Sequence, residues 1–511
     1  MINFINNLFK VHLKKYEAEL ALHYELPEQL QVDTLANLLV TMEGTAFGQD
    51  HHLAGVRHGA GFAERVPVRN YDELQPYLRR MLRGEDNVLS PDRVRWLAQT
   101  AGTTSGQSKY VPVTRDNIQE CHVKGSWMTL AMLHMQREDL KIFARKNLLI
   151  GGGVYDPHPD NGFPVADISA ILVHSIPLVV RPFYIPDVKT ATLPNYERKV
   201  RIIAEMAARE DSITMLGGVP TWNLALYRHI LEITGASNLL EVWPNLQAYI
   251  HGGVSFGPYR ETFRRLIPKP DFLYQEVYNA SEGYFALQDG EERDDMLLLL
   301  TNGIYYEFIP FEQFRSGDRT AIPLSEVEED VPYALVITTN AGLYRYLVGD
   351  LITFTTRSPY RIKIVGRTQE FINAFGEDLL SENVENALVK ACRETGAVVK
   401  DYTIAPYYLS ERERGRHQWF IEFLELPVEQ SVFTRSLDLA LQRENSNYAQ
   451  KRSNDFAISE LEVIALPPGF FQQWLRRKGK VGGQSKVPKL ANHRHFADEI
   501  LAEINTMIGE S

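Results

Sequence analysis

Hydrophobic residues in the first 90 positions recur at the spacing of amphipathic helices. Leu74, Leu78 and Met81 lie three or four residues apart, and Asn70 with Glu73 forms a capping-box pattern just before them. This pattern predicts a helix that begins after Asn70 and packs by one face. We expect the whole of residues 1–90 to be helical.

Beyond residue 90, short apolar runs alternate with amphipathic stretches. The runs predict strands over residues 93–98, 110–113, 147–150, 170–173 and 212–216. The stretches between them predict helices over residues 116–136, 195–210 and 222–234, the first of them capped by Thr114. Strands that alternate with helices favour an α/β fold with much parallel sheet.

Strand signals dominate between about residues 295 and 366, and a second alternating pattern follows. Apolar runs predict strands over residues 296–300, 304–309, 333–337 and 361–365. After them we expect helices over 381–394 and 430–443 and strands over 402–405, 418–423 and 459–464. The change of pattern predicts two domains, residues 1–375 and a smaller α/β domain of residues 376–511, joined by a short hinge.

Length and charge restrict the class of protein. At 511 residues the chain is too long for one hydrophobic core, and 44% hydrophobic with 23% charged residues is ordinary for a globular protein. A net charge of −11 argues against a nucleic-acid partner, because phosphate binding needs a basic surface. Two cysteines form no disulfide framework, and no apolar run reaches the ~18 residues of a membrane span. We expect a cytoplasmic monomer without a membrane partner.

The first candidate for chemistry is the loop within Gln99–Lys109, between two predicted strands. Its two glycines let several backbone N–H groups converge on one anion, and its threonine and serine hydroxyls add further donors. It is not a Walker P-loop, because only three residues separate Gly102 from Gly106 and the lysine comes three residues after the second glycine. The alternative interpretation is an ordinary polar hairpin connection.

A second candidate is the segment Gln275–Gly283, which follows an expected strand. Tyr278 offers an aromatic plane for a base, Ser281 can reach a phosphate, and Glu282 offers an oxygen ligand for Mg²⁺. The alternative interpretation of this segment is a simple turn.

The remaining candidates lie in the second half of the chain. Asp350 follows a glycine at the end of an expected strand, where a carboxylate can grip two ribose hydroxyls or cap its own turn. Gly366 and Arg367 come next, followed by Gly376 and Glu377. The basic, glycine-flanked loop of residues 476–486 ends in a lysine that can swing into an active site, or is a solvated surface segment.

Taken in order, these segments resemble the Gretchen Hagen family of acyl-acid amido synthetases, from Thr100 to Lys489. That family belongs to the adenylate-forming superfamily, which includes luciferases and acyl-CoA synthetases. The resemblance rests on three segments: Thr103-Thr104-Ser105, Tyr278–Gly283 and Tyr344-Arg-Tyr-Leu-Val-Gly-Asp350. Residues 304–310, Ile-Tyr-Tyr-Glu-Phe-Ile-Pro, are similar to a strand of this family rather than of the whole superfamily.

The resemblance implies a large adenylation domain, a mobile C-terminal domain, and a reaction that uses ATP and Mg²⁺. The acid would be adenylated with release of pyrophosphate, and an amino acid or other amine would then displace AMP. The resemblance also implies roles for individual residues. They are Thr103, Thr104 and Ser105 on the ATP phosphates, Gly253, Val254, Tyr278, Asn279 and Ser281 around the adenosine and phosphates, Glu282 on Mg²⁺, Asp350 and Arg367 at the ribose, and Lys486 as the lysine delivered by the small domain.

Three departures from the family pattern affect the expected site. Asn279 stands where the family has glycine, and Asp378 stands where some plant members carry lysine. Arg137 lies beyond the end of the helix predicted over residues 116–136, so no arginine within that helix can hold the acyl carboxylate. Trp127, Phe163, Trp222, Tyr305 and Tyr306 suggest a hydrophobic or aromatic acid.

Two rival functions remain open. The same adenylation ending on a thiol would make the protein an acyl-CoA synthetase-like ligase. A protein with a decayed site would bind nucleotide without catalysis, but Glu282, Asp350 and Lys486 are all intact.

Overall fold

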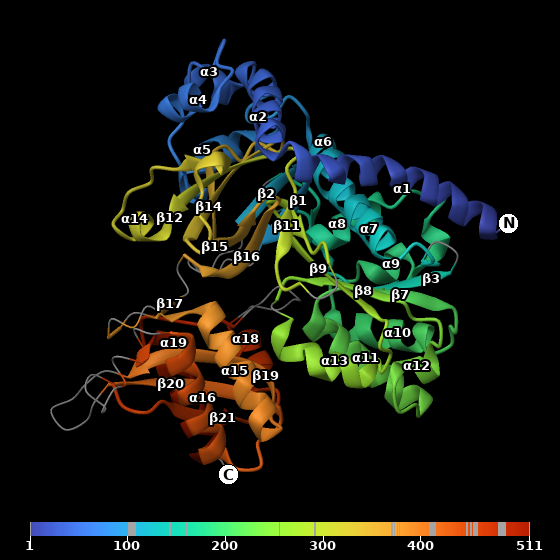
Figure 1. Ribbon diagram of the computed structural model, residues 1–511, viewed down its shortest axis with the longest axis vertical. Helices are drawn as coiled ribbons and strands as arrows, with labels where there is room; N and C mark the ends of the chain where they lie inside the picture. The colour runs from blue at the N-terminus through green and yellow to red at the C-terminus, as the bar shows by residue number, and fades with distance from the viewer. Residues whose placement is uncertain are drawn as a thin grey trace.

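The chain forms a large body and a smaller lobe in the computed structural model (Figure 1). The body holds the elements up to Arg367, and the lobe, drawn in orange and red, holds those from Phe371 on. The structure describes residues 2–100, 109–142, 145–158, 161–254, 256–290, 293–368, 371–372, 374–375, 377, 379–407, 415–445, 448–449, 452, 458–478 and 487–509. Among these residues, no helix is long and apolar enough to cross a membrane.

Helices cover much of the first part of the body, but residues 51–58, 66–70 and 83–90 are not helical, so the prediction for residues 1–90 holds only in part. They are α1 (Ile2–Glu25), α2 (Pro27–Glu43), α3 (Ala46–Asp50), α4 (Gly59–Arg65) and α5 (Tyr71–Leu82). The capping box that begins α5 is confirmed, because Glu73 N–H donates to Asn70 Oδ1 at 3.0 Å and Asn70 N–H donates to Glu73 Oε2 at 2.8 Å. Leu74, Leu78 and Met81 of α5 are buried.

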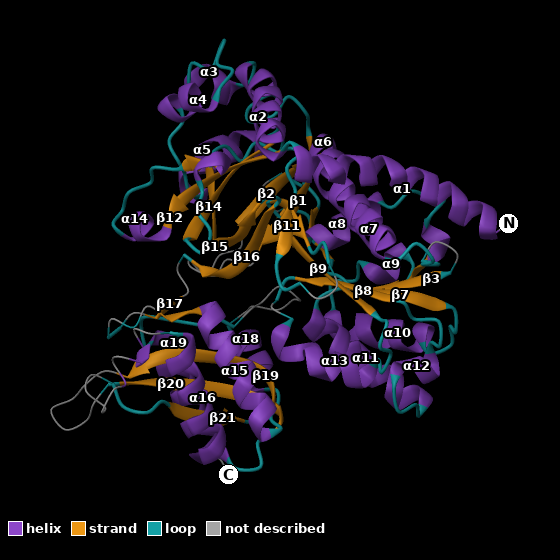
Figure 2. Ribbon diagram, viewed as in Figure 1, coloured by secondary structure: helices purple, strands orange, loops and turns teal. Residues whose placement is uncertain are grey.

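One large mixed sheet runs through the body (Figure 2). Its strands lie in the order β13 (Ile322–Pro323), β12 (Ile304–Pro310), β14 (Pro332–Thr339), β15 (Tyr346–Arg357), β16 (Tyr360–Arg367), β11 (Met296–Leu298), β10 (Gly283–Leu287), β9 (Leu273–Ala280), β8 (Ala248–Gly252), β7 (Ile213–Gly217), β3 (Lys146–Leu149) and β6 (Tyr184–Ile185). The half from β9 to β6 is parallel and the half from β13 to β10 is antiparallel. This confirms the α/β class, with a parallel part and a strand-rich antiparallel part.

Helices cover both faces of the parallel half (Figure 2). The helices of this part of the chain are α7 (Lys124–Gln136), α8 (Ile168–Ser175), α9 (Val188–Ala191), α10 (Tyr196–Ala207), α11 (Pro220–Thr234), α12 (Leu239–Val242) and α13 (Arg260–Leu266), and the short α6 (Arg115–Asn117) follows β2 of a separate sheet. The predicted helix over 116–136 exists but is interrupted by a π-helical segment, Ile118–Val123. Thr114 caps it as predicted, since its side chain accepts from Asn117 N–H. Arg137 lies just past the end of α7 and contacts Asp271.

A second, four-stranded sheet carries the first candidate segment. Its order is β2 (Lys109–Thr114), β1 (Val94–Thr100), β5 (Val165–Ala166) and β4 (Val154–Tyr155). Strands β1 and β2 are antiparallel, and Thr100 pairs with Lys109. The two ends of the glycine- and hydroxyl-rich loop are therefore held side by side, although Thr103, Thr104 and Ser105 themselves lie outside the described residues.

The lobe is a smaller α/β unit, as predicted. Its sheet is β19 (Val398–Tyr407), β20 (Arg416–Glu425) and β21 (Glu462–Leu466), next to a short hairpin of β17 (Phe371–Ile372) and β18 (Leu379–Leu380). The helices are α15 (Ser381–Thr395), α16 (Gln430–Glu444), α18 (Phe470–Arg477) and α19 (His495–Gly509). Trp419, Phe433 and Leu437 lie in its core. The boundary near residue 375 stays a prediction.

Four local predictions differ from the structure. Residues 170–173 belong to helix α8 rather than to a strand, because a four-residue apolar run fits a buried helix as well as a strand. Residues 275–280 lie within β9 rather than after a strand. Asp350 lies inside the twelve-residue strand β15, which passes through Gly349 at a φ of 95° and continues to Arg357. The strand expected over 459–464 begins three residues later, at Glu462.

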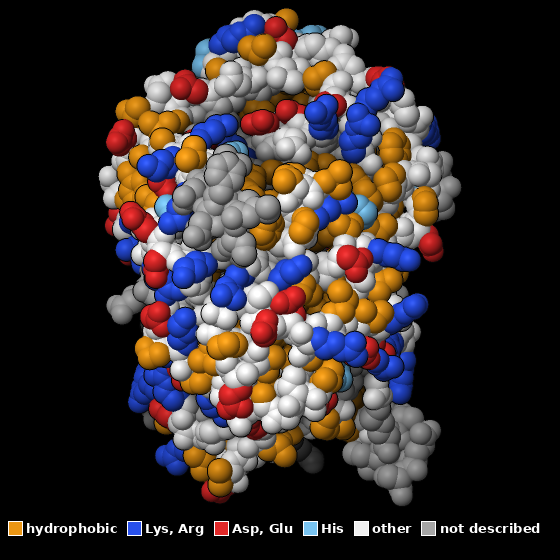
Figure 3. Space-filling model, turned by 90° about the vertical axis from the view of Figure 1, so that its right-hand side faces the viewer, with side chains coloured by type: hydrophobic (Ala, Val, Ile, Leu, Met, Phe, Trp, Pro, Cys, Tyr) orange, Lys and Arg blue, Asp and Glu red, His pale blue; other side chains and the backbone are white. Residues whose placement is uncertain are grey.

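Charges of both signs are scattered over the face shown in Figure 3, among hydrophobic side chains.

Helix α14 (Phe311–Arg315) lies at the antiparallel end of the body.

Candidate functional site

A cavity of about 1380 Å³ lies where the body meets the lobe. Its walls come from both parts, with β8, β9, β15 and β16 on one side and α15 and β19 on the other. The predicted site residues that the structure describes all line it: Gly253, Val254, Tyr278, Asn279, Ser281, Glu282, Asp350 and Arg367. Lys486 lies outside the described residues, and its neighbours Val487 and Lys489 line the cavity.

Tyr278, Asp350 and Arg367 form one connected group in this cavity. The Tyr278 hydroxyl donates to Asp350 Oδ2, and Arg367 Nε lies 3.1 Å from Asp350 Oδ1. Asp350 and Arg367 are direct partners in the β15–β16 ladder, so the pair is set by strand register. The Asp350 side chain is 16% exposed and Arg367 is 37% exposed. Each carboxylate oxygen has two lone pairs, so Asp350 can still accept hydrogen bonds from a ligand.

Glu282 lies at the turn between β9 and β10, close to the same group. Burial and the negative charge of Asp350 raise the pKa of Glu282, while Lys109 and Arg367 oppose that rise. A carboxylate that is costly to ionise, beside a second carboxylate, gains most from a bound cation. Mg²⁺ is held in proteins by one or two carboxylates together with substrate phosphates. The acidic side chains at this turn therefore fit a Mg²⁺–nucleotide.

The loop after β8 brings backbone close to this group. An added Cβ at Gly252 would lie 2.3 Å from the carbonyl oxygen of Val277 on β9, so only glycine allows the two strands this approach. Gly253 follows with a φ of 82°, in the left-handed region. The end of β8 is thus packed directly against the backbone of β9, next to Tyr278.

The side chain of Asn279 is engaged by a residue that the sequence did not reveal. His122 Nδ1 of the π-helical segment donates to Asn279 Oδ1 at 3.1 Å. Burial lowers the pKa of His122 to about 4, so the ring is neutral near pH 7. The two residues are 157 positions apart, and no local pattern links them.

Two further residues of the cavity lining, and one near Glu282, were not predicted as site residues. Glu276 lines the cavity two positions before Tyr278, and burial raises its pKa to about 7. His251 precedes the two glycines, and neither ring nitrogen has a partner in the described part of the chain. The hydroxyl of Tyr346 is buried without a described partner, and the charge of Glu282 acts on it. Glu276 and Tyr346 lie within the segments Gln275–Gly283 and Tyr344–Asp350, and that was the available signal.

The other end of the cavity is apolar. Trp127 and Trp222 line it, as suggested from the sequence. Tyr305 and Tyr306 do not, because both are buried in β12 within the main core. Phe163 is also not among the lining residues.

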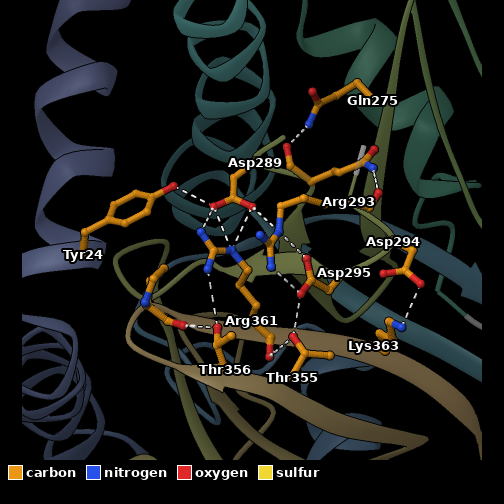
Figure 4. Close-up of polar contacts among 12 residues, drawn as sticks. Tyr24, Gln275, Asp289, Arg293, Asp294, Asp295, Thr355, Thr356, Arg361 and Lys363 are labelled. Atoms are coloured by element: carbon orange, nitrogen blue, oxygen red, sulfur yellow. Dashed lines mark hydrogen bonds and ion pairs between the residues drawn. The ribbon is translucent and has the colours of Figure 1, made fainter. Parts of the chain in front are cut away.

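A second ion-pair network anchors the strand that carries Arg367 (Figure 4). Arg361 of β16 binds Asp289 at 2.7 Å, and the Tyr24 hydroxyl of α1 donates to Asp289 Oδ2 at 2.7 Å. Arg293 pairs with Asp295 at 2.6 Å, and Asp295 accepts from Thr355 of β15 at 2.6 Å. These contacts fasten β15 and β16 to the body and so support the Asp350–Arg367 pairing.

Family models of three domains match successive parts of the chain. The GH3 family N-terminal domain matches residues 18–206 and 190–272, the GH3 family central domain matches 297–367, and the GH3 family C-terminal domain matches 382–495.

Curated relatives match over nearly the full length. An indole-3-acetic acid-amido synthetase, GH3.8, of Oryza sativa subsp. indica is 24% identical over 537 aligned positions, covering 90% of this chain and 88% of the relative. The indole-3-acetic acid-amido synthetase GH3.4 of Arabidopsis thaliana is 21% identical and covers 91% of this chain and 89% of its own length.

Solved structures share the fold. The AtGH3.15 acyl acid amido synthetase in complex with 2,4-DB superposes with a TM-score of 0.79 at 17% identity, covering 96% of both chains. A 2-hydroxyisobutyryl-CoA ligase in the postadenylation state superposes with a TM-score of 0.59 at 12% identity, covering 95% of this chain and 92% of the other.

Proposed function

The chain belongs to the GH3 family, and we propose that it is an ATP-dependent acyl-acid amido synthetase. It adenylates a carboxylic acid with release of pyrophosphate and transfers the acyl group to an amino acid or another amine. The relatives named above are amido synthetases, which favours an amine over a thiol as the acceptor.

The observation that carries the proposal is the convergence of Tyr278, Glu282, Asp350 and Arg367 in one cavity whose opposite end is apolar. A polar, acidic corner with an aromatic ring suits a Mg²⁺–nucleotide. An apolar continuation suits the body of an organic acid. The cavity thus has room for both halves of an acyl-adenylate.

We assign the following work to the residues. Tyr278 and the backbone of Gly253 and Val254 hold the base on its two faces. Asp350 accepts from the ribose hydroxyls, and Arg367 holds the Asp350 carboxylate in place. Ser281, Asn279 and the loop of Thr103, Thr104 and Ser105 complete the nucleotide site.

In the first step, the carboxylate of the acid attacks the α-phosphate of ATP and pyrophosphate leaves. Glu282 would hold Mg²⁺, which would neutralise phosphate charge when bound with ATP. Lys486 adds a positive charge at the phosphates. In the second step, an amine attacks the acyl carbon and AMP leaves.

The lobe acts as a mobile domain in this scheme, with the hinge near residue 375. Its face toward the body lines the cavity through α15 and Lys489. Rotation of the lobe between the two steps would withdraw Lys486 and admit the amine. Such a protein would act as a monomer in the cytoplasm. Light scattering of the purified chain, which measures its molar mass, would test the monomeric state.

The acceptor is tested by supplying the purified protein with ATP, Mg²⁺ and a panel of carboxylic acids, and measuring pyrophosphate release. Mass spectrometry then identifies the product formed with either amino acids or CoA. We expect an amide. A thioester would establish the acyl-CoA synthetase-like alternative, and no pyrophosphate with any acid would favour the non-catalytic alternative.

The role of Lys486 is tested by separating the two half-reactions. Lys486→Ala should slow acyl-adenylate formation by about 10²-fold, the scale of one lost electrostatic donor. Amide formation from a supplied acyl-adenylate should change far less. Lys478→Ala is the matched control, because Lys478 is engaged with Glu499 and stacks on the Trp474 ring at 4.4 Å. Equal slowing of both half-reactions would contradict delivery by the lobe.

A further inference from the structure

A second cavity lies behind the apolar end of the main one, at the β6 edge of the large sheet. It is a groove of about 850 Å³ between β6, α9, α10 and the loop that follows α8. Its rim carries basic side chains of Lys146, Arg181, Lys189 and Arg209 and acidic side chains of Asp187 and Glu210. The proposed function does not use this groove.

Four residues line both cavities: Leu149, Val173, Ile176 and Tyr184. They come from the end of β3, the end of α8, the residue after α8, and the start of β6. All four side chains are partly exposed rather than buried, which means that they border open space. The same four residues therefore border both cavities, and we call them the shared wall.

Leu149 shows how the shared wall closes the main cavity. It pairs with Gly217 of β7, and an added Cβ at Gly217 would lie 2.4 Å from Leu149 Cδ2. Gly217 itself lines the main cavity. The Leu149 side chain thus fills the space that the glycine leaves and ends the cavity at this point.

Charge sets the direction in which an acid must lie. Among the described residues from Thr100 to Trp222 that line the main cavity, none is charged. The acid's carboxylate has to reach the phosphates near Glu282, where the reaction takes place. The remainder of the acid then extends away from them, toward the uncharged end and the shared wall.

We propose that the shared wall sets the greatest length of acyl acid that the enzyme accepts, and that its substrates are elongated monocarboxylic acids without a second charge. This inference rests on the proposed function for the placement of the carboxylate. An acid longer than the cavity would collide with Leu149 or Tyr184. Removal of one such side chain would open the main cavity into the groove.

The test is a series of straight-chain acids from about six to about fourteen carbon atoms, each titrated into the protein by calorimetry. Affinity should rise about fourfold for each methylene that the cavity buries, and stop rising at the carbon that meets the shared wall. In Leu149→Ala, which lacks three carbon atoms of the shared wall, the chain length at which affinity stops rising should increase by about two or three methylenes. We call this chain length the limit. Val173→Ala, a smaller truncation, should move it by about one.

Leu178→Ala is the matched control, because the exposed Leu178 lines the groove but not the main cavity. It should leave the limit unchanged. The proposal is overturned if folded Leu149→Ala and Val173→Ala both keep the wild-type limit, if Leu178→Ala shifts it as much, or if no acid of the series binds. Pyrophosphate release, measured on the same acids, separates the two claims. A shifted binding limit without pyrophosphate release would refute the proposed function and leave the wall in place.

Discussion

Two aspartates of the body have the same kinds of partner and different surroundings. Asp289 binds Arg361 and accepts from the Tyr24 hydroxyl. Asp350 binds Arg367 and accepts from the Tyr278 hydroxyl. Both arginines lie on β16. Each group thus consists of an aspartate, a tyrosine hydroxyl and an arginine from the same strand.

The two groups differ in how far the aspartate is exposed and in how many arginines surround it. Asp289 is 1% exposed, and a second arginine, Arg293, lies 3.6 Å from its other oxygen. Asp350 is 16% exposed, its arginine is 37% exposed, and the remaining space belongs to the cavity. The same chemical parts form a structural brace where they are sealed and a binding group where one side stays open. Substitutions at matched positions can test this distinction.

The largest effect is expected on stability. Asp289→Ala leaves Arg361, whose side chain is only 14% exposed, without its carboxylate partner, which costs about 3–5 kcal/mol of unfolding free energy. Chemical denaturation followed by tryptophan fluorescence measures this loss. Asp350→Ala serves as the control and should cost about 1 kcal/mol or less, because water and the cavity already solvate its partner. Equal losses in the two variants would remove the distinction between brace and site.

Both groups were only partly predictable from the sequence. Asp350, Arg367 and Tyr278 were identified through short motifs, and the structure brings them together. The Asp289 group was not predicted, because Tyr24 is 265 positions from Asp289 and no motif marks either residue. A buried ion pair depends on long-range packing, which local hydrophobic patterns do not encode.

The next effect concerns nucleotide binding. If Asp350 accepts from both ribose hydroxyls, Asp350→Ala should weaken ATP binding by about 1.5–3 kcal/mol, the range of charge-assisted hydrogen bonds. Titration calorimetry with ATP and Mg²⁺ measures it. Unchanged affinity would mean that Asp350 only fixes the strands, as Asp289 does.

A smaller effect separates the two tyrosines. Tyr278→Phe keeps the aromatic ring but removes the donor to Asp350, so ATP binding should weaken by about 1–1.5 kcal/mol. Tyr24→Phe is its structural counterpart, and it should lower stability while leaving ATP affinity unchanged. A loss of ATP affinity in Tyr24→Phe would show that the brace and the site are coupled.

Local structure was predictable where pattern and length agreed. Helices α5, α10 and α15 and strands β1, β12 and β14 follow from cap residues and apolar runs. Helix α8 was taken for a strand because its apolar run is short, and the strand expected to end at Asp350 continues to Arg357 because Gly349 and Asp350 interrupt the apolar pattern of β15 without ending it. The partner of Asn279, His122, could not be predicted, because the contact depends on how the π-helical segment packs against β9.

Glu276 is a third carboxylate of the body, and it has no tyrosine and arginine partners of the kind that Asp289 and Asp350 have. It lines the same cavity, and its carboxylate has neither a tyrosine donor nor an ion pair within the described residues. Burial raises its pKa to about 7, and the charges of Glu385 and Asp294 add to the rise while Arg260 opposes it. Asp289 is buried among its partners, and Asp350 is partly exposed to the cavity. Glu276 has no ion-pair partner among the described residues, so of these three carboxylates it is the one expected to hold a proton.

Glu276→Gln should change the pH dependence of stability rather than its value at low pH. In the folded protein Glu276 keeps its proton up to about pH 7, whereas the unfolded chain loses it near the ordinary value of 4.5. The wild type therefore holds its full stability below about pH 4.5 and loses part of it as the pH rises through 7. Glutamine cannot ionise, so the variant should become more stable than the wild type above pH 7. The gain should be about 1 kcal/mol, since water in the cavity screens the charge. Denaturation curves at pH 5, 6, 7 and 8 measure the difference. Parallel curves over that range would show that Glu276 is already ionised and has a partner like the other two carboxylates.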